Sequence, residues 1–254
     1  MRNLLVLGCS YSHLSYHTNR EDSYTLHLKK ELGFDKLINL SVLGASPSTV
    51  NRILLQYLDN PVHGNPDFVF IQWPNSNRHE YYSDSIRDKD GLVYEVEDDL
   101  IQFNWTNGAK PDVSNGTWTS TTQTDLDKRL KGFHELAYAH KSQRMVNLYK
   151  EVGIAENYLG NLMIPYAYVE SDYWEDSHDG SLSVAPEDAL LDKQVQYAYK
   201  YARHLCHKGN FIPKLGIQRG STTYANDDYD DGHPGPISHR RFADALIPKL
   251  KELI

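Results

Sequence analysis

The stretch Asn3-Leu4-Leu5-Val6-Leu7-Gly8-Cys9-Ser10-Tyr11-Ser12 decides the fold that the sequence predicts. A short apolar run that stops at a glycine is typical of a buried strand that enters a tight turn. A stronger strand signal, Phe68-Val69-Phe70-Ile71-Gln72-Trp73, follows Pro66-Asp67. Residues 37–40 form a third, shorter strand candidate between these two.

Helical patterns separate these strand candidates. Residues 23–32 carry apolar side chains at helical spacing, with an N-cap candidate at Asp22 or Ser23 and a stop at Gly33. Residues 49–58 present one apolar helical face. Because strands alternate with helices from the start of the chain, we predict a parallel, doubly wound sheet.

The remaining chain predicts one domain over residues 1–254 with a long polar insertion after the third strand, at about 80–130. The insertion loses periodicity and gains Asp, Asn, Ser, Thr and Gly. A helix over 133–159, a strand over 162–169, and helices over 189–207 and 238–253 are expected to follow.

Composition excludes several classes of function. The net charge is -8, from 26 Lys and Arg against 34 Asp and Glu, so an average surface would repel nucleic acid. No apolar run approaches the roughly 20 residues of a membrane span. The apolar stretch before Cys9 is too short for a secretory signal, so we expect a cytoplasmic protein at synthesis. The mean hydropathy of -0.59 reflects the polar insertion.

Ser10 is a candidate nucleophile because its turn follows the first strand. In doubly wound folds, ligands bind at the carboxyl edge of the sheet. The simpler alternative is that Ser10 caps the following segment. Cys9 is a weaker nucleophile candidate, because an apolar strand end raises the pKa of a thiol.

A matching base lies near the end of the chain, in Asp230-Asp231-Gly232-His233-Pro234. A serine hydroxyl needs a histidine to take its proton and a carboxylate to orient that histidine. His233 and Asp230 supply both groups, and Asp231 is the alternative carboxylate. A solvated acidic turn is the competing interpretation.

A third element is Asn39-Leu40-Ser41-Val42-Leu43-Gly44, which follows the second strand candidate. A glycine there lets a backbone N–H approach a developing oxyanion. No HExxH motif or His/Cys cluster is present, so we expect no metal and no cofactor.

Together, these positions resemble the SGNH, or GDSL-like, hydrolase family. Its first block, Gly-Asp-Ser-x-(Ser/Thr), is matched by residues 8–12 with Cys9 in place of Asp. Its second, Asn-x-x-x-x-Gly, is matched by residues 39–44, and its last, Asp-x-x-His-Pro, by residues 230–234. The order of the blocks along the chain also agrees.

The resemblance implies a flavodoxin-like three-layer α/β/α sandwich with a central parallel sheet. It also implies Ser10 as nucleophile, His233 as general base and Asp230 as its orienting carboxylate. The oxyanion hole would use the N–H groups of Ser10 and Gly44 and a side chain of the third block.

The third block, usually Gly-x-Asn-Asp, is altered. An ungapped match puts Pro74 at its glycine and Ser76 at its asparagine. A shift of the match by one residue in either direction would make Asn75 or Asn77 the side chain that donates to the oxyanion. Loss of such a donor costs about 100- to 1000-fold in rate. The altered block leaves the presence of hydrolytic activity open.

Two hypotheses follow. The first is a serine esterase or O-deacetylase acting on small acyl groups, with a carbohydrate ester as one substrate class; Trp105, Trp118, Tyr173 and Trp174 are of a kind that stacks on sugars. The second is a non-catalytic binding or structural protein on the same scaffold, such as a component of a phage particle. It is motivated by the altered third block and the polar insertion.

Overall fold

A computed structural model describes residues 1–14, 20–74, 78–81, 93–97, 99–104, 119–121, 141–170 and 235–254. The predicted helix over 189–207 and the candidate site residues Asn75, Ser76, Asn77, Asp230, Asp231 and His233 lie outside them.

Within the described residues, the central sheet has six strands in the order β5-β6-β2-β1-β3-β8. Their bounds are β1 Asn3–Leu7, β2 Lys36–Asn39, β3 Phe68–Trp73, β5 Val93–Glu97, β6 Leu100–Asn104 and β8 Tyr166–Glu170. Five strands run parallel, and β5 pairs antiparallel with β6 at one edge. A separate two-stranded sheet pairs β4 (His79–Tyr81) with β7 (Thr119–Thr121). The predicted parallel, doubly wound sheet is confirmed.

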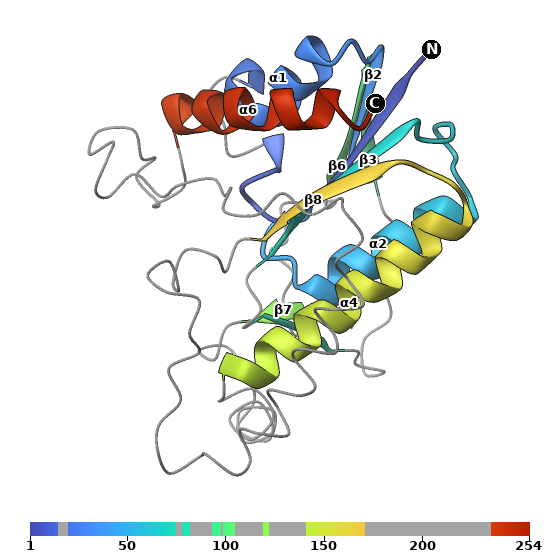
Figure 1. Cartoon of the computed structure of the whole chain (residues 1–254), viewed down its shortest axis with the longest axis vertical. Helices are drawn as coiled ribbons and strands as arrows, with labels where there is room; N and C mark the ends of the chain where they lie inside the picture. The colour runs from blue at the N-terminus through green and yellow to red at the C-terminus, as the bar shows by residue number, and fades with distance from the viewer. Residues whose placement is uncertain are drawn as a thin grey trace.

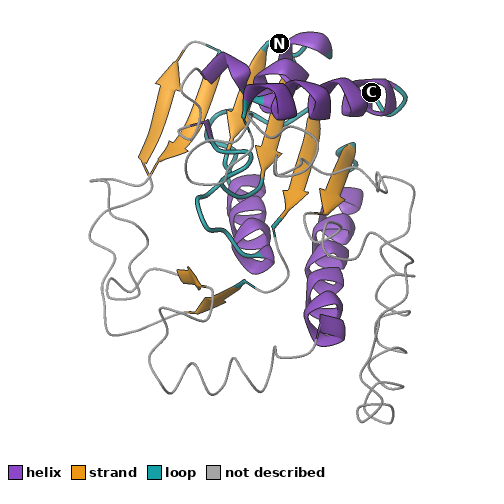
Figure 2. Ribbon diagram, turned by 90° about the vertical axis from the view of Figure 1, so that its left-hand side faces the viewer, coloured by secondary structure: helices purple, strands orange, loops and turns teal. Residues whose placement is uncertain are grey.

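Helices cover both faces of the sheet (Figures 1 and 2). Helices α1 (Tyr24–Glu31) and α6 (Pro236–Lys251) lie side by side on one face, next to the short 3-10 helix η2 (Arg20–Asp22). Helices α2 (Pro47–Asp59) and α4 (Lys141–Asn161) pack together on the other. The result is the three-layer α/β/α sandwich that the resemblance implied.

Strand alternation divides the core into two halves. Leu5 and Leu7 of β1 point toward α2 and α4, whereas Leu4 and Val6 point toward α1 and α6. All four side chains are fully buried. Successive side chains of a strand point to opposite faces, so a continuous apolar run marks a strand that is covered on both sides.

Side-chain caps explain where two helices begin. The Ser23 hydroxyl accepts a hydrogen bond from the backbone N–H of Thr25 and caps α1. Ser46 forms a capping box with Thr49 and places Pro47 in the first turn of α2. Helix α2 therefore starts two residues before the predicted position, because a proline in the first turn has no N–H to leave unsatisfied.

The region expected to be a polar insertion contributes strands to the central sheet. Within it, β6 pairs in parallel with β2, and Leu100 and Ile101 are buried there. Strands β5 and β6 were not predicted, because each is a short segment in which apolar and polar residues are mixed. The insertion is therefore interrupted by a return to the sheet.

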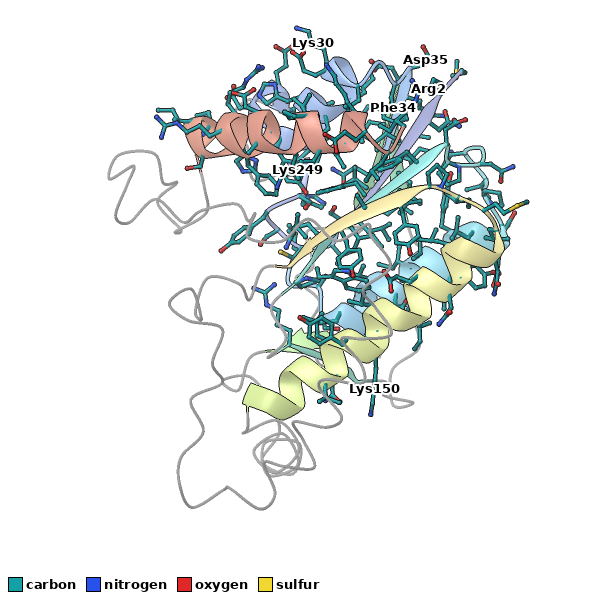
Figure 3. The ribbon with its side chains drawn as sticks, viewed as in Figure 1. Arg2, Lys30, Phe34, Asp35, Lys150 and Lys249 are labelled. Atoms are coloured by element: carbon teal, nitrogen blue, oxygen red, sulfur yellow. The ribbon has the colours of Figure 1, made fainter. Side chains whose placement is uncertain are left out.

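The amino edge of the sheet carries a charged cluster that is separate from the candidate site. Figure 3 shows Arg2, Phe34 and Asp35 together there, with the Arg2 guanidinium 4.8 Å from the centre of the Phe34 ring. A nearby cavity of about 830 Å³ is lined by Phe34 and by charged side chains of α1 and its neighbours. Its Lys29 forms an ion pair with Asp99.

Candidate functional site

The nucleophile turn, residues Gly8 to His13, leaves the sheet at the carboxyl end of β1. Strand β2 lies on one side of β1 and β3 on the other, so successive connections diverge at β1. Such a divergence is the topological switch point at which α/β sheets bind ligands. The structure thus places Ser10 where the sequence predicted a site.

Backbone hydrogen bonds close the turn around Ser10. The N–H of Ser12 donates to the carbonyl of Cys9 at 3.0 Å, and the N–H of His13 donates to the carbonyl of Ser10 at 3.3 Å. Ser10 is 6% exposed. Among the described residues, no acceptor is found for its backbone N–H, which leaves that donor available to a bound group.

The loop after β2 is bonded directly to this turn. The N–H of Val42 donates to the carbonyl of Gly8 at 3.1 Å, and the Asn39 side-chain amide donates to the carbonyl of Ser12 at 2.7 Å. The other side-chain atom of Asn39, Oδ1, accepts from the N–H of Ser41 at 3.1 Å. Asn39 thereby joins the first two sequence blocks.

Gly44 occupies this loop with φ of +72°. This left-handed conformation strains any residue with a Cβ, which explains the glycine. Its backbone N–H, like that of Ser10, has no acceptor among the residues that the structure describes. Ser10 and Gly44 are thus brought to neighbouring loops of one edge, and each has an uncommitted N–H there.

Arg78 is a site residue that the sequence did not single out. It follows β3 and is half-buried, and its Nη1 lies 3.5 Å from the carbonyl oxygen of Ala45, the neighbour of Gly44. The contact places a guanidinium against the loop that carries the Gly44 N–H. An arginine five residues after a strand carries no motif by which the sequence could have revealed it.

The described side chains that lie beneath the turn form a polar group without a charge. Gln72, Ser12 and Tyr24 form a buried hydrogen-bonded group beneath it. Burial raises the pKa of the Tyr24 phenol far above its ordinary value, so the hydroxyl stays protonated. His239 of α6 stacks on the Tyr24 ring. Its Nδ1 accepts a hydrogen bond from the backbone N–H of Tyr24 at 3.3 Å.

The partners that the sequence assigned to Ser10 lie outside the described residues, so the triad and the third oxyanion donor stay predictions. The same holds for Trp105, Trp118, Tyr173 and Trp174. The described residues hold no group of three His, Cys, Asp or Glu side chains that could bind a metal. None of the helices in this part of the chain combines the length and apolar character needed to cross a membrane.

The fold and the placement of Ser10 define an α/β protein with the SGNH-hydrolase architecture. Neither known protein families nor curated protein sequences match the chain. Among solved structures, it is similar to TesA, with a TM-score of 0.51, 13% identity and 100% of each chain covered. It is also similar to the psychrotrophic esterase EstA from Pseudoalteromonas sp., with a TM-score of 0.50, 11% identity, and 99% of this chain and 98% of EstA covered. At such identities the likeness shows the fold.

Proposed function

We propose that the protein is a serine esterase that removes small acyl groups from ester substrates. The observation that carries this proposal is the pair of uncommitted N–H groups at Ser10 and Gly44, on loops joined by hydrogen bonds at the switch point. Two such donors suit the oxyanion of a tetrahedral intermediate. The similarity in fold to EstA, an esterase described as inhibited by monoethylphosphonate, is consistent with it.

In the proposed reaction, the Ser10 hydroxyl oxygen attacks the ester carbonyl while His233 takes the hydroxyl proton. Asp230 orients His233 and stabilises the imidazolium that forms. The tetrahedral oxyanion accepts hydrogen bonds from the Ser10 and Gly44 N–H groups and from Asn75. Collapse expels the alcohol, which receives the proton from His233, and leaves an acyl-Ser10 ester. Water activated by His233 then releases the acid.

The finer proposal is that the acyl group is small, such as acetyl, and that the alcohol belongs to a carbohydrate. The aromatic residues Trp105, Trp118, Tyr173 and Trp174 support the carbohydrate part, because aromatic rings of this kind stack on sugars. Release of acetate from an acetylated oligosaccharide, compared with release from p-nitrophenyl acetate, tests it. An enzyme that cleaves only the small ester would contradict the carbohydrate assignment.

The test of the nucleophile uses two adjacent variants. We expect a fluorophosphonate probe to label the wild-type protein at one site, Ser10→Ala to abolish labelling and p-nitrophenyl acetate turnover, and Cys9→Ala to retain both. Loss of labelling in Cys9→Ala but not in Ser10→Ala would make Cys9 the nucleophile. A folded wild-type protein that neither labels nor turns over would favour the non-catalytic scaffold.

Activity should also depend on pH through the base. His233 must be neutral to accept a proton, so we expect kcat/KM to fall as the pH drops below about 6.5, the ordinary pKa of histidine. A pH profile that stays flat from 8 to 5 would rule out a histidine base.

A further inference from the structure

A buried polar group beneath the nucleophile turn has no place in the reaction proposed above. Its centre is Gln72 of β3, which is 1% exposed and points toward the α1 and α6 face of the sheet. A buried polar side chain is costly unless its donors and acceptors are satisfied. The hydrogen-bond partners of the Gln72 side chain therefore explain why a polar residue is buried at this position.

Within the part of the chain that the structure describes, the amide oxygen of Gln72 contacts three donors, all of them on the turn. Oε1 lies 3.2 Å from the backbone nitrogen of Cys9, 3.2 Å from the Cys9 Sγ and 3.1 Å from the Ser12 Oγ. The other polar atom of the Gln72 amide, Nε2, donates to the carbonyl of Trp73 at 3.1 Å. If the Gln72 amide were flipped, its NH2 group would face the donors of Cys9 and Ser12. These donors therefore fix the orientation of the Gln72 amide.

Ser12 connects Gln72 to Tyr24 of α1 through two hydrogen bonds, and the donor of each can be assigned. Because the Ser12 hydroxyl has one proton and Gln72 Oε1 can only accept, Ser12 donates to Gln72 and accepts from the Tyr24 hydroxyl, 2.5 Å away. Tyr24 remains protonated and can donate. The turn is thus bonded from below to a strand and, through Ser12, to a helix.

Gly8 leaves room for these contacts. A Cβ at this position would lie 2.5 Å from the Ser12 Oγ and 2.8 Å from the Gln72 Oε1. The backbone of the turn and the amide of Gln72 are therefore packed against each other without a side chain between them. A small change at Gln72 would be transmitted directly to the peptide that precedes Ser10.

We infer that Gln72 is a positioning residue for the nucleophile, an inference that rests on the proposed esterase function. Its oxygen binds the N–H of Cys9 and thereby fixes the peptide next to that of Ser10, whose own N–H has no acceptor among the described residues. It also fixes Ser12, and so holds the turn on both sides of the Ser10 hydroxyl. Gln72 does not touch the substrate; it acts through the geometry of Ser10.

The experiment compares two replacements of Gln72. Gln72→Met keeps the length of the side chain but removes both the acceptor and the donor of the amide. Gln72→Glu keeps an acceptor oxygen for the three donors, and burial favours its protonated form, which keeps a donor toward the Trp73 carbonyl. Since a displacement of 1 Å can cost about 100-fold in rate, we expect Gln72→Met to lower kcat by about 10- to 100-fold at an unchanged KM. Gln72→Glu should lie within about 10-fold of the wild type. The rate constant of fluorophosphonate labelling should follow kcat.

Asn51→Leu is the matched control for stability. Asn51 is also buried, and its Nδ2 donates to the Glu151 carboxylate at 2.8 Å, which ties α2 to α4 away from the turn. This variant should lower the melting temperature and leave kcat unchanged. A fall in kcat that is confined to the Gln72 variants then separates positioning from a general loss of stability.

Each outcome decides between the two proposals. A folded Gln72→Met protein with the kcat and labelling rate of the wild type overturns the role of Gln72 alone, as does a rise in KM at constant kcat. If Gln72→Met does not fold, Gln72→Glu decides: a folded variant that no longer labels overturns the role. A wild-type protein that does not label contradicts the esterase function and the role of Gln72 with it.

Discussion

Replacing Gly8 with alanine should destabilise the protein, because the turn has no room for a methyl group. The added Cβ would lie 2.5 Å from the Ser12 Oγ, 2.8 Å from the Gln72 Oε1 and 3.0 Å from the Ser12 Cβ. Carbon atoms in proteins pack best at about 3.5 to 4.0 Å. Neither neighbour can rotate away without losing the hydrogen bonds that join Ser12 to Gln72 and Tyr24.

The expected cost combines three effects. Overpacking costs about 1 to 3 kcal/mol, and loss of a buried hydrogen bond costs about 1 to 3 kcal/mol. Replacing glycine by alanine restores about 0.4 to 1 kcal/mol through the entropy of the unfolded chain. The free energy of unfolding should therefore fall by about 1 to 5.6 kcal/mol in Gly8→Ala.

Urea denaturation followed by tryptophan fluorescence measures this change. If only the stability changes, the slope of the unfolding free energy against urea concentration stays the same. Gly160→Ala in the last turn of α4 is the control, since an added Cβ there meets nothing within 4 Å. It should raise stability by up to about 1 kcal/mol. Gly8→Ala with the midpoint and slope of the wild type would refute the reasoning.

Three further predictions concern stability. Tyr24→Phe keeps the ring against α6 but removes the hydroxyl that donates to Ser12, and should cost about 1 to 2 kcal/mol in urea denaturation. Ser23→Ala removes the cap of α1 and should cost about 1 kcal/mol by the same measurement. Desolvation lowers the pKa of His27 and of His63. The unfolded chain therefore binds protons first as the pH falls below about 6.5, and the unfolding midpoint should drop there, but less so in a variant with glutamine at both histidines.

Local patterns explain why part of the fold could be predicted from the sequence. Strand β1 is a continuous apolar run after Asn3, β3 is apolar apart from Gln72, and α1 has both a cap and a glycine stop, so neighbouring residues carry the information. Strands β5 and β6 could not be predicted in this way. Leu100 and Ile101 are buried by pairing with β2, some 60 residues away, and no local periodicity announces that contact.

Some residues of the candidate site could likewise be predicted from local sequence, and others could not. Ser10 and Gly44 were predicted because each follows a strand within a recognisable block. Gln72 was not, since a lone glutamine in an apolar strand gives no functional signal and its partners Cys9 and Ser12 lie 63 and 60 residues away. A network of this kind becomes visible only when the register of β1 and β3 places Leu7 beside Ile71.

The pairing of α1 with α6 bears on how the chain assembles during its synthesis. The 65 residues between β8 and α6 separate the last strand of the sheet from the helix that contributes Phe242 and Leu246 to the core. At the usual elongation rate of roughly 5 to 20 residues per second, the ribosome needs about 3 to 13 s to make them. Throughout that interval the patch that α6 will cover stays open, whereas α2 and α4 have already been translated. The core cluster that includes Phe242 and Leu246 is therefore completed only after this interval.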